Sequence, residues 1–333
     1  MKSQYINTIA EGTRIDSVFA VSTKELRSSR SGEAYLSLQL GDRTGRMAAV
    51  MFKPDAAAQE LPAGTVARVE GVATTFRGVR RISVERLHAA EKWDSADLLP
   101  ASPRDVGELL SQLRALVRTV DDPNLARLLR VVFGDKAFMR TFLACPAAQS
   151  NHHAYLGGLL EHTVGVATLC AQAASQYRDT DRDLLVTGAL LHDVGKVEEL
   201  TFSTTIEYTD AGRFVGHIVL GEARLRRAID RLTGFPEGLA MRLTHLILSH
   251  HGELESGSPK QPCTLEAVIL HQCDELDAQA SGFVQSATGA SRVEEQWTDS
   301  QNQFGRPLYA PIDVLAESGP SAPGLRSVAG ARA

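Results

Sequence analysis

The sequence predicts a multidomain protein in which a small N-terminal β-barrel is followed by an all-α helical bundle. Its 333 residues are enough for two domains, at about 150 residues each. Residues 13–88 read as short strands broken by turns, and after Trp93 the apolar residues recur at helical spacing. Because the composition, 43% hydrophobic and 23% charged, is that of an ordinary globular protein, we expect both parts to fold.

Five segments of the N-terminal part are expected to be strands. The clearest is 34–40, where residues alternate and three leucines share one face. The others are 14–23, 46–52, 65–73 and 79–87. Five short strands without a long helix among them fit a small closed barrel such as the OB-fold. We place this domain at residues 1–92.

Residues 93–150 are predicted to be a linker and the helices that lead into the second domain. Pro100 and Pro103 mark the linker, and Ser102 is the expected N-cap of a helix over 106–117. This segment therefore separates the two predicted domains.

The second domain, placed at 151–315, is predicted to be all helical. Its apolar residues follow helical spacing in the segments 159–177, 182–192, 217–232, 238–250 and 264–280, and the segment 124–144, which precedes the domain, shows the same spacing. The tail at 316–333 is rich in Ala, Gly, Ser and Pro, and we expect it to be disordered.

Charge and cysteine content narrow the class of protein. Residues 1–92 carry a net charge of +4, which would favour binding of a polyanion. Residues 93–333 carry a net charge of −9, which would favour binding of metal cations. The four cysteines show no CxxC spacing, so we expect reduced, buried thiols. No apolar stretch is long enough for a membrane span, and the N-terminus has no secretory apolar region. We therefore expect a cytoplasmic protein.

Histidine and aspartate form an ordered series in the second half of the chain. Nine of the ten histidines lie between 152 and 271. A lone histidine in an apolar helix is usually a core residue, but this set recurs on consecutive predicted helices. Imidazole and carboxylate are the ligands of divalent metals, and a metal pair can activate water and clamp a phosphate. The series, which predicts a metal-dependent phosphohydrolase, is His162, His192, Asp193, His217, His250, His251 and Asp274.

The series divides into two predicted metal sites. Adjacent side chains on a helix point about 100° apart, so His192 and Asp193 can coordinate one ion from two sides. His162 and Asp274, each in an apolar helix, would complete the first site; Asp277, three residues later, is the alternative ligand. Lys196 would project toward the same site and hold a phosphate oxygen.

The second predicted site uses the remaining histidines. His217, His250 and His251 would complete it, with Asp193 bridging both ions. His245 and His271 are expected to pack or to face water. The predicted catalytic residues are therefore Asp193 and Lys196, and the predicted cofactor is a pair of divalent ions per chain.

These motifs resemble those of a known enzyme family. The helical part looks like the HD-domain metal phosphohydrolase superfamily, and barrel plus helical domain is similar to the YhaM-type 3′→5′ exoribonucleases over residues 10–310. The resemblance implies an exonuclease that prefers manganese or cobalt and acts on RNA and single-stranded DNA; iron, nickel and magnesium stay open. No Gly-Tyr-Pro triplet follows Lys196, which disfavours the cyclic-dinucleotide branch. The segments that carry the resemblance are 152–163, the most specific one, and 192–196, 216–217, 249–252 and 271–278.

The barrel carries candidate nucleic-acid-binding residues. Single-strand-binding barrels pair a basic groove with aromatic platforms. Tyr35 lies on the face opposite the leucines, where it can stack on a base, whereas Phe19, Phe52 and Phe76 are assigned to the core. The candidate cations lie in or next to turns and are Arg43, Arg46, Arg77, Arg80 and Arg81.

The leading functional hypothesis is a metal-dependent 3′→5′ exonuclease that releases nucleoside 5′-monophosphates from single-stranded RNA, and from DNA as a further substrate. A homo-oligomer would help to enclose the strand. Two alternatives stay open. One is a phosphohydrolase for nucleotides or small phosphate esters, which would not need a barrel. The other is a non-catalytic nucleic-acid-binding protein with a structural metal, against which the complete ligand set argues.

Overall fold

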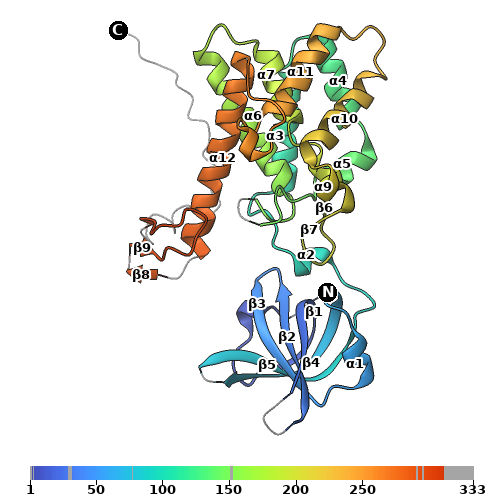
Figure 1. The fold of residues 1–333 in the computed structure, drawn as a ribbon, viewed down its shortest axis with the longest axis vertical. Helices are drawn as coiled ribbons and strands as arrows, with labels where there is room; N and C mark the ends of the chain where they lie inside the picture. Colours follow the sequence, from blue (N-terminus) through green and yellow to red (C-terminus); the bar gives the residue numbers. More distant parts are fainter. Residues whose placement is uncertain are drawn as a thin grey trace.

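The computed structural model describes residues 2, 4–28, 32–76, 78–150, 153–289, 292–294 and 296–310. Within these ranges the chain forms a closed β-barrel followed by a helical bundle, as Figure 1 shows. The predicted fold class is therefore confirmed. Three predictions lie outside the described residues: the role of Arg77, the disorder of the tail at 316–333, and the first residue of the segment 152–163.

The barrel contains the five predicted strands. Around it they run in the order β1-β2-β3-β5-β4, with β4 pairing back to β1, and only β3 and β5 are parallel. Alternation sends Leu36, Leu38 and Leu40 inward, where they pack with Phe19, as predicted, and Ile82. The elements are β1 (Arg14–Ser28), β2 (Ala34–Asp42), β3 (Gly45–Phe52), β4 (Val66–Phe76) and β5 (Val79–Ala89), with η1 (Ile6–Thr8) before them and α1 (Ala56–Glu60) after β3.

The bundle begins beyond a short helix, α2 (Ser95–Leu98), in the linker. Its main helices agree with the predicted segments, apart from two N-terminal boundaries described below and two C-terminal ends. The helix predicted to end at 232 ends at Ile229, and the helix predicted to end at 280 continues to Gly289. They are α3 (Val106–Arg118), α4 (Pro123–Phe133), α5 (Lys136–Phe142), α6 (Gly158–Gln176), α7 (Arg182–Leu191), α10 (His217–Ile229), α11 (Glu237–Ser249) and α12 (Leu265–Gly289). The smaller elements are α8 (Lys196–Glu199), β6 (Leu200–Thr201), β7 (Glu207–Tyr208), α9 (Asp210–Phe214), η2 (Leu254–Ser256), β8 (Arg292–Glu294) and β9 (Trp297–Thr298).

Two helix boundaries differ from the prediction because aspartates compete as N-caps. The segment 124–144 is split, since Asp135 accepts from Ala137 N and Phe138 N and starts a new helix, α5. Asp105, not Ser102, caps α3, through a 2.8 Å bond from Glu108 N. The Ser102 hydroxyl is used elsewhere in the fold, as described below.

Helix α7 forms the centre of the bundle. Its residues from Leu184 to Leu191 are all buried, because the sequence LLVTGALL is apolar on every side. Gly188 allows α11 to approach closely, since a Cβ there would lie 2.5 Å from Leu246 Cδ1. This rigid helix delivers His192 and Asp193 at its C-terminal end.

The barrel and the bundle meet at the hairpin of β6 and β7. Thr204 Oγ1, between these two strands, donates to Gly64 O in the barrel at 3.0 Å. Figure 1 shows β6, β7 and α9 on the edge of the bundle that faces the barrel. Of the helices in the described ranges, none combines the length and the apolar character that crossing a membrane requires.

Candidate metal centre

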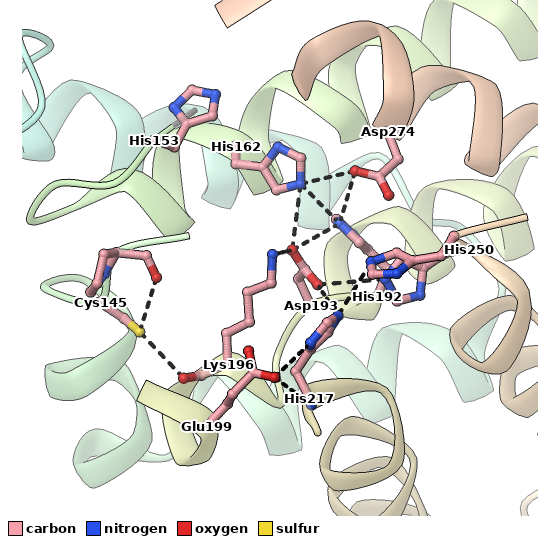
Figure 2. Close-up of polar contacts among 12 residues, drawn as sticks. Cys145, His153, His162, His192, Asp193, Lys196, Glu199, His217, His250 and Asp274 are labelled. Carbon is pink, nitrogen blue, oxygen red and sulfur yellow. Dashed lines mark hydrogen bonds and ion pairs between the residues drawn. The ribbon is translucent and has the colours of Figure 1, made fainter. Parts of the chain in front are cut away.

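The histidines and aspartates of the predicted series converge at one place in the bundle (Figure 2). Helix α6 supplies His162, the turn after α7 supplies His192 and Asp193, and α12 supplies Asp274. The remaining members come from the start of α10 and the end of α11. Residues separated by more than a hundred positions therefore meet because five helices of the bundle pack against one another.

The first group contains four side-chain atoms that face one another. His162 Nε2 lies 3.1 Å from Asp274 Oδ1, 3.4 Å from Asp193 Oδ2 and 3.2 Å from His192 Nε2. His192 Nε2 lies 3.4 Å from Asp193 Oδ2. These are two imidazole nitrogens and two carboxylate oxygens, a donor set suited to a divalent cation.

The second group lies on the other side of Asp193. Oδ1 of Asp193 is 3.6 Å from Nε2 of His217 and 3.6 Å from Nε2 of His250. His251 Nε2 lies 3.3 Å from His217 Nε2, and the ligand atoms of the three histidines all lie within 4.8 Å of one another. The two oxygens of one carboxylate thus face two separate groups of imidazoles.

Hydrogen bonds at Nδ1 fix the orientation of the imidazoles. His192 Nδ1 donates to Ala189 O at 2.7 Å, and His250 Nδ1 donates to Ile247 O at 2.7 Å. His251 Nδ1 donates in the same way to Ser256 O at 3.0 Å. A carbonyl oxygen only accepts, so each ring carries its proton on Nδ1 and turns an unprotonated Nε2 toward the group.

These atoms fit a cation better than they fit one another. The unprotonated Nε2 atoms of His192 and His251 lie only 3.2 and 3.3 Å from Nε2 of His162 and His217, and each of these contacts needs a proton or a metal ion between the two nitrogens. Among the described residues, Asp193 Oδ1 and His250 Nε2 are buried with no hydrogen-bond partner. Such orphaned polar atoms are costly in a protein interior, and a bound metal would remove the cost.

The geometry separates the two aspartates that the sequence left as alternatives. Asp274 directs Oδ1 at His162 Nε2 inside the first group, whereas Asp277 accepts from Nδ1 of the same ring at 2.8 Å. Asp274 therefore lies among the potential ligands and Asp277 lies behind them.

Lys196 reaches the same carboxylate, although not through the continuous helix on which the spacing argument depends. The chain turns after α7 instead of continuing as a helix, and Lys196 Nζ lies 2.8 Å from Asp193 Oδ2. Burial lowers the pKa of Lys196, but Asp193, Asp274 and Glu199 outweigh burial and hold that pKa above its usual value. Burial likewise opposes ionisation of Asp193, yet Lys196 and the imidazoles keep its pKa well below the usual range. The pair is therefore ionic.

Glycine 195 allows the turn to approach α10. A Cβ at this position would lie 2.0 Å from His217 O and 2.5 Å from Gly221 N. The start of α10, and with it His217, is thereby placed directly against the His192–Asp193 turn.

Glu199 is a contributor that the sequence did not reveal. Its Oε1 accepts from both the backbone N and Nδ1 of His217, each at 2.9 Å. Burial raises the pKa of Glu199, but His217 and Lys196 outweigh this and lower it. No motif singles out Glu199, since its partner is 18 residues away in the chain.

The two histidines expected to pack or to face water lie apart from both groups. His271 Nδ1 bonds to His250 O at 2.9 Å, and His245 Nε2 accepts from Cys263 N at 3.0 Å. The site itself opens to solvent at Asp274 and His217, whose side chains are 15% and 14% exposed.

On the barrel, the structure divides the predicted nucleic-acid residues. Arg43 lies over the Tyr5 ring at 4.4 Å, and Arg80 Nη1 donates to Ile9 O at 2.9 Å. Both therefore contact the segment that precedes β1. Arg43, Arg46 and Arg80 are all exposed, and Arg46 lies on β3.

Two phenylalanines assigned to the core are exposed, so that assignment is wrong. Phe52 and Phe76 are 52% and 51% exposed, because strand alternation places Phe52 on the outer side of β3, opposite buried Met51, and Phe76 on the outer side of β4, opposite buried Ala73. Phe52 pairs with Tyr35 at a ring distance of 5.8 Å, and Arg81 lies over Phe76 at 4.3 Å. We name the outer surface formed by Tyr35, Arg46, Phe52, Phe76 and Arg81 the aromatic–arginine face.

Comparison with known proteins agrees with this architecture. Residues 159–279 match the HD domain. The 3′-5′ exoribonuclease YhaM of Bacillus velezensis is 32% identical over 272 residues, which cover 80% of this chain and 86% of the relative. YhaM of Geobacillus sp. is 28% identical over 318 residues, covering 93% and 97%. The second OB-fold domain of replication protein A from Methanococcus maripaludis is 23% identical with a TM-score of 0.23, covering 28% of this chain and 99% of that one.

Proposed function

This chain belongs to the YhaM family of 3′-5′ exoribonucleases, and from that premise we propose that it is a metal-dependent exonuclease acting on single-stranded RNA. It would remove nucleotides from the 3′ end and release nucleoside 5′-monophosphates, and single-stranded DNA would be a further substrate. The observation that carries the proposal is the Asp193 carboxylate, whose two oxygens face two groups of imidazoles.

The two groups are the proposed metal sites. One ion would be held by His162, His192, Asp193 and Asp274, and the other by Asp193, His217, His250 and His251. Divalent ions bound there would polarise the scissile phosphate and ease deprotonation of the attacking water. We propose manganese or cobalt first, with iron, nickel and magnesium as the other ions that this donor set accepts.

Lys196 is the proposed phosphate-binding cation. Its ammonium group is buried beside Asp193, and its raised pKa keeps it charged at neutral pH. A fixed positive charge in a site of low polarity stabilises the extra negative charge of a phosphoryl transition state. Lys196 would thus act on a non-bridging phosphate oxygen while Asp193 orients the ammonium.

The aromatic–arginine face is the proposed track for the strand. Tyr35 and Phe52 offer rings at one end, and Arg81 on Phe76 adds a cation–π pair. Ala48, the strand partner of Arg81, is exposed on the same outer side of β3 as Phe52. Stacking tolerates any base, as a processive nuclease requires.

The test uses a 5′-labelled single-stranded RNA, with the parent chain and Asp193→Ala in the presence of Mn²⁺ or EDTA. We expect a ladder of products shortened from the 3′ end when the parent is incubated with Mn²⁺, and no such ladder with EDTA or with Asp193→Ala. Equal digestion by Asp193→Ala would disprove the metal site.

Bis(p-nitrophenyl) phosphate serves as a comparison substrate that needs no strand track. If the parent hydrolyses it but leaves RNA intact, the chain is a small-ester phosphohydrolase instead. Tight RNA binding without turnover in Mn²⁺, Co²⁺, Mg²⁺ and Ni²⁺ would indicate a non-catalytic binding protein.

A further inference from the structure

A chain of polar side chains runs behind His162, and the proposed chemistry leaves it unused. Asp277 Oδ2 accepts from His162 Nδ1 at 2.8 Å and lies 3.0 Å from His153 Nε2. On the opposite edge of the His153 ring, Nδ1 lies 2.8 Å from the Tyr155 hydroxyl. That hydroxyl donates to Glu161 Oε2 at 2.9 Å.

The far end of this chain lies in the linker between the barrel and the bundle. The Ser102 hydroxyl donates to Glu161 Oε2 at 2.6 Å. The linker backbone is tied to the same segment, because Ser102 N donates to Leu156 O and Leu156 N donates to Pro100 O, both at 2.8 Å. The network therefore connects the linker to a proposed metal ligand.

The backbone around His153 is arranged to place this ring. His153 has a φ of 51°, in the left-handed region that residues other than glycine rarely adopt, and its side chain is buried. Its carbonyl accepts from Ala147 N at 3.1 Å and Tyr155 N at 2.9 Å. Gly158 leaves room for that carbonyl, since a Cβ would come within 2.1 Å of it. A strained residue held by several bonds is typical of functional sites.

Hydrogen-bond roles decide which nitrogen of His162 carries the proton. An ionised carboxylate can only accept, so Asp277 requires a hydrogen on His162 Nδ1. Nε2, which faces Asp193 and Asp274, is then the nitrogen that can release its proton in exchange for a metal ion. The partner behind a ligating imidazole sets its tautomer, its orientation and its basicity.

We propose that Asp277 and His153 are positioning residues that hold His162 in its metal-binding tautomer, and that Tyr155, Glu161 and Ser102 anchor them to the linker. This inference rests on the proposed metal centre. It also gives a physical role to the segment 153–162, whose spacing alone predicts nothing beyond the ligand His162.

The first experiment measures Mn²⁺ binding by electron paramagnetic resonance, with no RNA present. Asp277→Ala removes the acceptor, and we expect a 10- to 100-fold weaker affinity at one site. Asp277→Asn keeps a carbonyl oxygen for Nδ1 and should recover part of the loss. Glu275→Gln is the matched control, because Glu275 is an exposed carboxylate of α12 that bonds to Gln279. Parent-like affinity in Asp277→Ala would overturn the proposal.

A second variant tests the network without altering Asp277. Tyr155→Phe removes only the hydroxyl that links His153 to Glu161, and we expect a smaller loss, under about ten-fold, of the same Mn²⁺ affinity. Thermal melting of each metal-free variant checks that it folds. A folded Tyr155→Phe with parent affinity would remove Tyr155, Glu161 and Ser102 from the proposed anchor.

A third measurement separates this inference from the proposed function. In metal-free protein labelled with ¹⁵N-histidine, we expect Nδ1 of His162 to carry a proton that is hydrogen-bonded to Asp277, and Asp277→Ala to lose that hydrogen bond. If the parent binds no Mn²⁺ but shows this hydrogen bond, the metal centre fails and the positioning network stands. If the parent binds Mn²⁺ and the Nδ1 signal of His162 is the same in both proteins, only the network fails.

Discussion

Oδ1 of Asp193 lies 3.6 Å from Nε2 of His250, and among the described residues neither atom has a hydrogen-bond partner. Both atoms are buried. Desolvation of such a pair is costly without a cation between the two atoms. The metal-free protein should therefore be less stable than the loaded one.

We predict that Mn²⁺ raises the melting temperature of the protein. A ligand that binds only the folded state at about a hundred times its Kd adds about 2.7 kcal/mol of stability. For a protein of this size that corresponds to several degrees, measurable by differential scanning fluorimetry. EDTA should reverse the shift, and Asp193→Ala should abolish it. A parent melting temperature that Mn²⁺, Co²⁺, Fe²⁺, Ni²⁺ and Mg²⁺ all leave unchanged would contradict a metal centre.

His217 tests the number of ions. It belongs to the second group alone, and it is held by Glu199 at 2.9 Å. We predict a metal content near two per chain in the parent and near one in His217→Ala, measured by elemental analysis after gel filtration. His245→Ala is the control, since His245 contacts Cys263 instead. One ion per chain in both parent and His217→Ala would rule out the second site.

The aromatic–arginine face should determine RNA affinity without affecting the chemistry. Base stacking on an aromatic ring is worth about 1–3 kcal/mol, so Phe52→Ala and Phe76→Ala should each weaken RNA binding by about 5- to 150-fold. Hydrolysis of bis(p-nitrophenyl) phosphate should be unchanged. Arg81→Ala should weaken binding as well, whereas Arg68→Ala is the charge control, because Arg68 pairs with Asp16 between β4 and β1. Unaltered RNA affinity in all three variants would place the strand elsewhere.

The order of helices and strands could be predicted because periodicity is local. His192 and Asp193 follow an apolar helix, and this position already indicates a buried polar pair. The sequence could not decide which of Asp274 and Asp277 faces the metal site. Side chains three positions apart lie on the same face of a helix, so both aspartates can reach the same neighbouring helix. Only the packing of α12 against α6 places Asp274 beside Nε2 of His162 and Asp277 beside Nδ1 of the same ring.

The exposure of Phe52 and Phe76 depends on which side of each strand faces the core. Met51 and Ala73 are buried in the barrel, so Phe52 and Phe76, one and three positions after them, point outward. The apolar character of a phenylalanine by itself suggests burial and does not reveal this side. Exposed aromatics are therefore easily mistaken for core residues in a sequence.

Lys196 offers the sharpest separation of catalysis from metal binding. Its ammonium lies 2.8 Å from Asp193 Oδ2, the oxygen that faces His162 and His192, so it repels a cation bound there. Lys196→Met keeps the length of the side chain and removes the charge. We predict that kcat on RNA falls by about 10²- to 10³-fold, because charge stabilisation of the phosphate is lost. The Mn²⁺-induced rise in melting temperature should persist.

Lys196→Arg keeps the charge and should retain more activity than Lys196→Met, although its planar group fits a point contact less well. Because the pKa of Lys196 is raised, its ammonium stays protonated below the ordinary lysine pKa, so its contribution to kcat should not decline as the pH rises from 6 to 9. If Lys196→Met loses the Mn²⁺-induced stabilisation together with kcat, the lysine supports the ligand Asp193 and not the phosphate. An unchanged kcat would remove Lys196 from the catalytic site altogether.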